Sequence, residues 1–294
     1  MTALRQDVAQ RECWGGDEAG ANVDTPGDTG WRRDPAQRLA LARTIEAEII
    51  PRLLLAHRVR PRRDAALAEG AWAPARVDIE AFATLLLASE DAAALAYVEA
   101  IRARGVALEA IYLELFAPAA RHLGDLWLED ARDFAEVTLG LCRLHQFLHR
   151  FSAAFHDGRE HAEHGRRALI LPVPGEQHSF GAVMVAEFFR RAGWDVQSDA
   201  VPTIEAAAAS AREAWFDVFG LSVSCEAHLD RVGATIRAVR RASRNPRIVV
   251  LVGGRVFLEQ PHLAELVGAD ATASDALQAA VRAQALVGTV AGHG

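Results

Sequence analysis

The sequence predicts an α/β fold, in which a helical bundle precedes a doubly wound parallel sheet. Two observations carry this prediction. In the first half, apolar residues recur at spacings of three and four, as in amphipathic helices. From residue 167 onward, short apolar runs alternate with helical segments, as in successive βα units. The length of 294 residues suits two domains.

The N-terminal half divides into a tail and a bundle. Residues 1–34 are rich in Gly, Asp, Thr and Arg without an apolar period, which predicts a flexible tail. Residues 35–157 predict a helical bundle with short connections. Its helices are expected from Pro35 through Leu53, from an N-cap at Asp78, over 93–104, over 108–127 after a break at Gly105, and over 132–155.

The C-terminal half predicts a Rossmann-like domain. Residues 158–166 are polar and charged and predict a linker, and residues 167–290 form the domain. Strands are expected at 167–172, 195–200, 217–223, 247–252 and 270–273. Helices are expected at 181–192, 203–214, 227–243, 257–267 and 275–287. Five βα units of this length predict a doubly wound parallel sheet.

Composition and charge narrow the class of protein. The net charge of -7 argues against a protein that wraps nucleic acid by charge alone. The three cysteines form no C-x-x-C pair, which fits a reducing cytoplasm. No signal segment and no apolar run of transmembrane length is evident, so no membrane partner is expected. A basic run over 52–63 favours a solvated loop over a partner or nucleic-acid contact, and direct contact with DNA stays open.

The most informative segment is the loop that follows the first expected strand. It carries Glu176, His178 and Gly181 in an E-x-H-x-x-G pattern. A loop between a buried strand and a helix N-terminus lies at the carboxyl edge of an α/β sheet, where ligands bind. A histidine there is available as a metal ligand, and a carboxylate two residues earlier can fix its tautomer. Gly181 lets a bulky ligand approach the backbone.

Two further motifs follow the next buried strands. Ser222-Val223-Ser224 comes directly after one, and Gly253-Gly254 comes directly after another. With the E-x-H-x-x-G loop, they resemble the cobalamin-binding module, whose motifs are D/E-x-H-x-x-G, then S-x-L/S/T, then G-G. The resemblance covers roughly residues 165–290 and predicts cobalamin as the cofactor.

The resemblance implies a role for each motif residue. His178 would be the lower axial ligand of cobalt, replacing the detached benzimidazole tail, with Glu176 bonded to its second ring nitrogen. Ser222, Ser224, Gly253 and Gly254 would line the slot for that tail, because small residues leave it room.

For the other histidines, the sequence favours solvent-exposed or structural positions over metal binding. His156, His161 and His164 lie close together, but without a Cys pair a solvated linker is favoured over zinc. His145 and His149 share one face of the last bundle helix. A metal pair there is conceivable, and a position at the bundle surface or boundary is favoured.

The bundle resembles the cap over the upper corrin face in light-sensing regulators of this class, which carry W-x9-E-H. Trp127 is present and would lie over the corrin, but Val137 and Thr138 occupy the Glu-His positions. Leu128 stands where adenosylcobalamin receptors have a cobalt-capping histidine. These departures favour hydroxo- or aquocobalamin over the adenosyl form.

A bundle joined to a cobalamin module, alone, resembles two groups. One is the PpaA/AerR antirepressors, which bind cobalamin and act on PpsR/CrtJ-type repressors of photosynthesis genes. The other is the corrinoid methyl-carrier subunits of methyltransferases, which usually have Asp where this chain has Glu176. The sequence favours a light-responsive antirepressor without enzymatic activity. A nucleotide- or SAM-binding protein is disfavoured because no G-x-G-x-x-G or P-loop is present.

Overall fold

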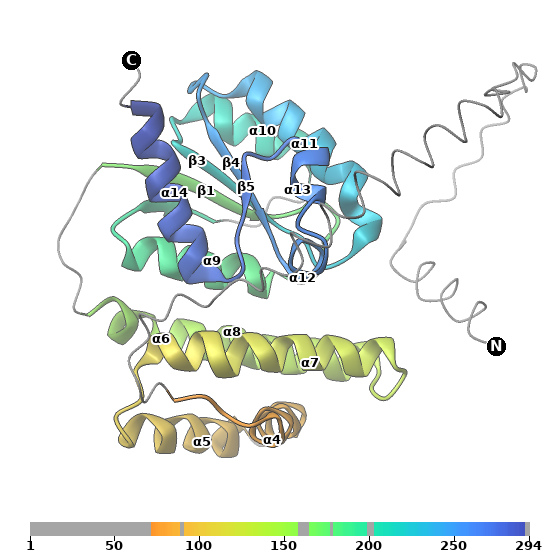
Figure 1. The fold of residues 1–294 in the computed structure, drawn as a ribbon. Coiled ribbons are helices and arrows are strands. Elements are labelled where there is room, and N and C mark those ends of the chain that lie inside the picture. Colours follow the sequence, from red (N-terminus) through yellow and green to blue (C-terminus); the bar gives the residue numbers. More distant parts are fainter. Residues whose placement is uncertain (1–71, 89–90, 158–164, 177–178, 199–202, 292–294) are drawn as a thin grey trace, which may run out of the picture. The chain divides into compact units, whose positions relative to one another are not determined.

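The computed structural model describes residues 72–88, 91–157, 165–176, 179–198 and 203–291. It shows a group of helices followed by a five-stranded parallel sheet with helices on both faces, which confirms the predicted fold class (Figure 1). The predicted tail at 1–34, the expected helix from Pro35 to Leu53 and the basic run at 52–63 lie outside the described residues.

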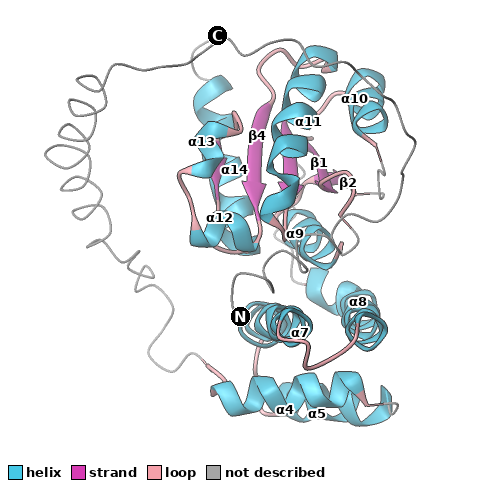
Figure 2. Cartoon of the chain, turned by 90° about the vertical axis from the view of Figure 1, so that its right-hand side faces the viewer, coloured by secondary structure: helices cyan, strands magenta, loops and turns pink. Residues whose placement is uncertain are grey.

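The bundle helices lie where apolar periodicity places them. In Figure 2, α4 (Arg76–Leu87) and α5 (Asp91–Ala103) form one layer against α7 (Ala117–Leu128) and α8 (Phe134–His156). A short α6 (Leu108–Ile111) and a π-helical turn (Tyr112–Phe116) lead directly into α7. Gly105 has a φ of 84° and follows the end of α5, as the sequence predicts.

Two helix starts show how local polar groups set the boundaries. Asp78 was expected as an N-cap, and this is wrong because α4 begins earlier, with Ala75 as its N-cap. The Asp78 carboxylate instead reaches back and accepts the Ala75 backbone N–H at 2.8 Å. At the start of α8, Asp133 and Glu136 form a reciprocal capping box, with bonds of 2.8 and 3.0 Å.

The sheet places its strands in the order β2-β1-β3-β4-β5, all parallel. The strands are β1 (Arg167–Pro172), β2 (Asp195–Gln197), β3 (Val218–Ser222), β4 (Val249–Gly253) and β5 (Ala271–Thr272). The chain runs outward from β1 to β2 and then returns to β3. The carboxyl ends of β1 and β3 therefore form the topological switch point, where α/β sheets bind ligands.

Helices cover both faces of the sheet (Figure 1). One face packs against α9 (Phe180–Arg191) and α14 (Ala276–Ala291). The other packs against α11 (Leu229–Ala242), α10 (Ile204–Glu213), α12 (Arg255–Glu259) and α13 (Leu263–Leu266). The single helix expected at 257–267 is wrong, because Pro261 lies between α12 and α13 and lacks the amide hydrogen that a continuous helix requires.

Helix α9 joins the sheet to the bundle. Its residues Ala182, Ala186 and Phe189 pack in the core against the sheet. Its residues Phe180, Met184 and Phe188 belong to the core of the bundle. The Phe188 ring meets Tyr112 and Phe155 of the bundle edge to face, at centroid distances of 6.4 and 5.1 Å. Helix α9 therefore takes part in two apolar cores, one in each half of the described chain.

A buried carboxylate on α9 strengthens this junction. Glu187 accepts a hydrogen bond of 2.6 Å from Ser152 of α8, and it pairs with Arg190 at 2.9 Å. His156 of α8 lies 3.3 Å from the same carboxylate, with its side chain only 20% exposed. The expectation that His156 lies in a solvated linker is wrong, because α8 continues through His156 and turns its side chain toward Glu187. A buried charge requires such partners.

In the part of the chain that the structure describes, no helix combines the length and the apolar composition needed to cross a bilayer.

The packing of α9 against the bundle yields a stability prediction. Phe188→Ala should lower the free energy of unfolding by about 3–5 kcal/mol, because it leaves a cavity between α9 and the bundle. Leu266→Ala is the matched control, since its side chain is 75% exposed and its loss should cost less than about 0.5 kcal/mol. Urea unfolding followed by circular dichroism measures both. Equal urea midpoints for the two variants would contradict the burial of Phe188 between α9 and the bundle.

Candidate functional site

The three predicted motifs converge at the switch point of the sheet. The loop after Pro172 leads through Glu176 to α9, and in the sheet register Ser222 pairs with Pro172 on one side and Gly253 on the other. The backbone continues this pairing beyond the strands, since Val173 donates to the Ser222 carbonyl at 3.0 Å. Segments far apart in the sequence are thus brought to one edge, as expected for a ligand site.

Glu176 links the first motif to the second. Its Oε2 atom accepts the Ser224 backbone N–H at 3.1 Å and the Ser224 hydroxyl at 2.5 Å. His178 lies outside the described residues, so the expected Glu176–His178 bond is neither seen nor contradicted. Ser224 was expected to line the slot for the nucleotide tail. In the structure it donates to Glu176 and fixes that carboxylate.

His228 is a member of this edge that sequence reasoning missed. It ends a short 3-10 turn (Glu226–His228), and its side chain is only 7% exposed. Its Nδ1 lies 3.6 Å from Glu176 Oε2 and has no hydrogen-bond partner within the described residues. Only its position four residues after Ser224 hinted at a contact. The structure therefore adds a second imidazole, unpaired at one nitrogen, beside the motif carboxylate.

Gly181 is required by a close approach inside the protein. A Cβ atom at this position would lie 2.7 Å from the Ser222 hydroxyl oxygen, which is closer than real Cβ contacts come. Gly181 was expected to admit a ligand to the backbone. In the structure, the absence of a side chain at Gly181 lets the first turn of α9 pack closely against the end of β3. The Ser222 hydroxyl fills the space that a side chain at position 181 would need.

The two glycines of the third motif differ in role. A Cβ atom on Gly253 would meet nothing within 4 Å, so the end of β4 faces open space. Gly254 has a φ of 104°, and a Cβ there would lie 2.1 Å from the Val223 carbonyl oxygen. Gly253 thus provides room for a ligand, while Gly254 is required by the backbone itself.

The bundle residues expected over the ligand lie on α7 and α8. Trp127 is partly buried against the bundle core, and its ring meets Phe134 edge to face at 6.3 Å. Thr138 of α8 has a buried hydroxyl oxygen without a hydrogen-bond partner among the described residues. Leu128 is 54% exposed at the end of α7.

Helix α8 extends past the start of α9. Ser152 bonds to Glu187, and His145 contacts Ser179. The partners are 35 and 34 residues apart, so a step forward along α8 matches an equal step forward along α9. The two helices therefore run side by side in the same direction. Thr138, two turns before His145, lies on the same face of α8 and beyond the N-terminus of α9, which is the direction of the motif edge.

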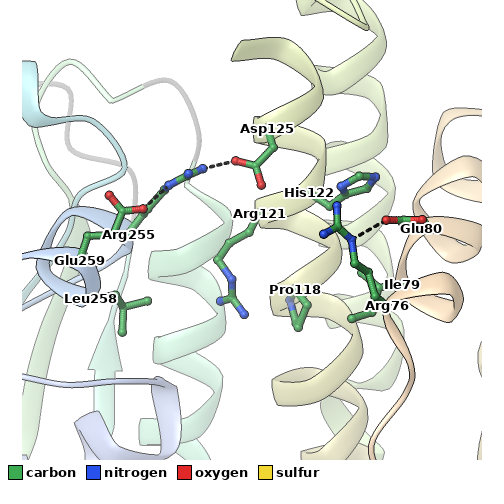
Figure 3. Close-up of a pocket in the computed structure, with 10 residues that line it drawn as sticks. All are labelled: Arg76, Ile79, Glu80, Pro118, Arg121, His122, Asp125, Arg255, Leu258 and Glu259. Carbon is green, nitrogen blue, oxygen red and sulfur yellow. Dashed lines mark hydrogen bonds and ion pairs between the residues drawn. The ribbon is translucent and has the colours of Figure 1, made fainter. Parts of the chain in front are cut away.

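A cavity of about 420 Å³ lies between α4, α7 and α12, and Figure 3 shows its charged lining. Arg255, which directly follows Gly254, pairs with Asp125 of α7 and with Glu259 at 2.8 Å. The hydrogen bonds that Arg255 donates to these two carboxylates raise its pKa, whereas burial lowers the pKa of Arg121 in the same cavity. The lining residues are Arg76, Ile79, Glu80, Pro118, Arg121, His122, Asp125, Arg255, Leu258 and Glu259.

The Asp125–Arg255 pair is a second contact between bundle and sheet. Its two side chains are 40% and 38% exposed, so it is worth at most about 1 kcal/mol. Within the described residues, no group of three or more His, Cys, Asp or Glu side chains could hold a metal ion by itself.

Comparison with known proteins assigns the sheet domain. Residues 166–281 match the family model described as "B12 binding domain". The match spans the three motifs and the strands that carry them, and it confirms the predicted resemblance to the cobalamin-binding module.

One curated relative and one solved structure extend beyond the B12-binding domain. The chain is 28% identical over 176 residues to the "Uncharacterized 20.5 kDa protein in bchF-crtJ intergenic region" of Rhodobacter capsulatus, covering 59% of this chain and 90% of that protein. It is similar in fold to the monomethylamine corrinoid protein of Methanosarcina barkeri, with a TM-score of 0.58 and 16% identity. That similarity covers 72% of this chain and all of the other.

The geometry of the motif edge and of the bundle beside it fits a corrinoid. Open space at Gly253 lies at the end of β4, next to Ser222 in the register of the sheet. Nδ1 of His228 and the hydroxyl of Thr138 are buried polar atoms without a hydrogen bond among the described residues, and a bound group with amide side chains could satisfy them.

The contrast between the two glycines is testable. Gly254→Ala should destabilise the fold by at least about 1–3 kcal/mol, because it places a side chain at a strained φ against Val223. Gly253→Ala should leave the unfolding midpoint nearly unchanged.

Gly253→Leu should keep the fold and block cobalamin binding by steric overlap, as measured by spectroscopic titration. Wild-type affinity in Gly253→Leu would show that the nucleotide tail lies elsewhere.

Proposed function

We propose that this protein is a cobalamin-binding, light-responsive antirepressor that acts on a PpsR/CrtJ-type repressor and has no enzymatic activity. The observation that carries the proposal is the B12-binding domain, with all three motifs at one sheet edge and a helical bundle fused to it through α9. The described chain thus offers a candidate site at one sheet edge and a helical bundle packed beside it.

In this proposal the chain's own residues hold and orient the cofactor. His178 would hold the cobalt, and Glu176, whose carboxylate accepts the Ser224 hydroxyl, would orient the His178 ring. Ser222 and Gly253 border the slot for the nucleotide tail. When bound, cobalamin supplies a cobalt centre whose upper ligand responds to light.

The upper side of the site favours a small ligand on cobalt. Leu128 and Val137 cannot coordinate a metal, and Thr138 offers only a hydroxyl. A buried, unpaired hydroxyl is suited to hydrogen-bond water or hydroxide. These residues support the hydroxo or aquo form of cobalamin over the adenosyl form.

The ligand assignment is tested by variants of the loop. His178→Ala should abolish or severely weaken cobalamin uptake and change the absorption spectrum of any residual complex. Glu176→Ala should weaken binding by about 10–100-fold, as is typical for a residue that orients a metal ligand. The measurement is titration with aquocobalamin in the dark. If His178→Ala took up cobalamin as the wild type does, with the same absorption spectrum, His178 would not be the cobalt ligand.

The relative from Rhodobacter capsulatus supports the regulatory partner. Its name places it in the region between bchF and crtJ, and crtJ shares its name with the repressor that the family resemblance implies. A regulator encoded beside the repressor it controls is a common arrangement. This location supports a PpsR/CrtJ-type partner for the present chain.

The partner is tested by pull-down of a purified PpsR/CrtJ-type repressor. The bait is compared as apo protein, as cobalamin-loaded protein in the dark, and as the same sample after illumination. Binding should differ between states, because a ligand shifts a conformational equilibrium only through differential affinity. His178→Ala is the matched control and should not respond to cobalamin. Equal, negligible binding in all states would contradict the antirepressor role.

A corrinoid methyl carrier is the alternative function. The fold similarity to the monomethylamine corrinoid protein supports it, since that protein also spans bundle and sheet. A carrier would accumulate methylcobalamin when supplied with reductant and a methylamine-specific methyltransferase, whereas an antirepressor would not. The absorption spectrum of the bound cofactor separates the two functions.

A further inference from the structure

His145 of α8 is held at both ring nitrogens. Its Nδ1 lies 3.1 Å from the Leu141 carbonyl oxygen, and its Nε2 lies 3.5 Å from the Ser179 hydroxyl. Because a carbonyl only accepts, Nδ1 carries the proton and donates to it. In the neutral ring, Nε2 then has the lone pair and accepts a long hydrogen bond from the Ser179 hydroxyl.

The other half of this contact departs from usual helix capping. Ser179 is the N-cap of α9, a position where serine normally accepts a backbone N–H of the first turn. Its side chain makes no such capping bond here. The hydroxyl is directed to His145 instead, and the next residue, Phe180, packs its ring against the His145 ring at 5.4 Å and 78°. Two consecutive residues of the ligand loop thus contact one bundle histidine.

The position of the contact gives it significance. Ser179 directly follows His178, and Glu176 at the other end of the same short segment is fixed by Ser224. The described residues on either side of 177–178 are therefore each held from elsewhere in the chain: Glu176 by Ser224, which follows β3, and Ser179 by His145 of α8.

We infer that His145 is a positioning residue that sets the ligand loop and reports its state to the bundle. The inference rests on the proposed role of His178 as a cobalt ligand. When His178 coordinates cobalt, a shift of the loop changes the Ser179–His145 contact, while α8 keeps its register on α9. Conversely, loss of His145 loosens the loop and weakens coordination by His178.

The chain offers a matched set of variants. His145→Ala and Ser179→Ala each remove the contact, and His145→Gln keeps an acceptor within reach of Ser179. His149→Ala is the control, because His149 lies one turn further along α8 and is exposed. Three measurements are made: titration with aquocobalamin, hydrogen exchange of amides 173–183 without cobalamin, and electron paramagnetic resonance of the reduced Co(II) complex with ¹⁵N-histidine-labelled protein. The last measurement identifies coordination by a protein histidine directly.

His145→Ala and Ser179→Ala should each weaken binding by about 10–100-fold and reduce the histidine-coordinated fraction of cobalt. They should also speed exchange in the loop. The double variant should be no worse than either single one, because both remove the same interaction. His145→Gln should restore part of the histidine-coordinated signal, which a purely structural role in the bundle would not do.

Two results would overturn the inference: wild-type coordination and exchange in His145→Ala, or fully additive effects in the double variant. Failure of the proposed function is distinguishable. If the wild-type protein bound no cobalamin, the proposed role of His178 as a cobalt ligand would be wrong. The exchange measurement, which needs no cofactor, would still decide whether His145 holds the loop.

Discussion

The burial of α9 on two sides is the constraint on which the rest of the structure depends. One side of this helix completes the core against the sheet, and the other completes the core of the bundle. A helix buried in this way cannot shift without disturbing both cores, because protein interiors are close-packed. Its N-terminus therefore presents the ligand loop at a fixed place relative to both the strand ends and α8.

The polar groups along the α8–α9 contact follow from that burial. Glu187 sits in the junction with its side chain 7% exposed, so it needs hydrogen-bonding and cationic partners. Ser152, His156 and Arg190 provide them. The Glu187 charge also adds to burial in raising the pKa of Tyr112, which keeps that hydroxyl neutral inside the bundle core. Together, these groups fix one register between the two helices, which apolar contacts alone would leave free to slide.

The fold and the location of the site were predictable from the sequence because they depend on short-range patterns. Strand and helix periodicity placed β1, β3 and β4, and motifs at their ends indicated one sheet edge. The bonds within the site were not predictable, because they join residues distant in the chain. Glu176 and Ser224 are 48 residues apart, and His145 and Ser179 are 34 apart. The differing roles of Gly253 and Gly254 depend on the position of Val223, which no local pattern specifies.

The two contacts between bundle and sheet differ in strength, and this difference determines where a signal can act. The α8–α9 contact is apolar and buried, and removing one of its large side chains costs several kcal/mol. The contact between α7 and α12 rests on Asp125 and Arg255, an exposed pair worth at most about 1 kcal/mol. Arg255 directly follows the glycine pair at the ligand edge.

A change in the ligand is thus coupled most directly to the weaker contact. A differential affinity of about 1 kcal/mol shifts a two-state equilibrium roughly fivefold, which is enough to open or close an ion pair of this strength. The same energy is too small to separate α8 from α9. We therefore expect α8 and α9 to keep their register in every state of the cofactor. The exposed end of α7, with Trp127 and Leu128, is then the part of the bundle free to change its surface for a partner.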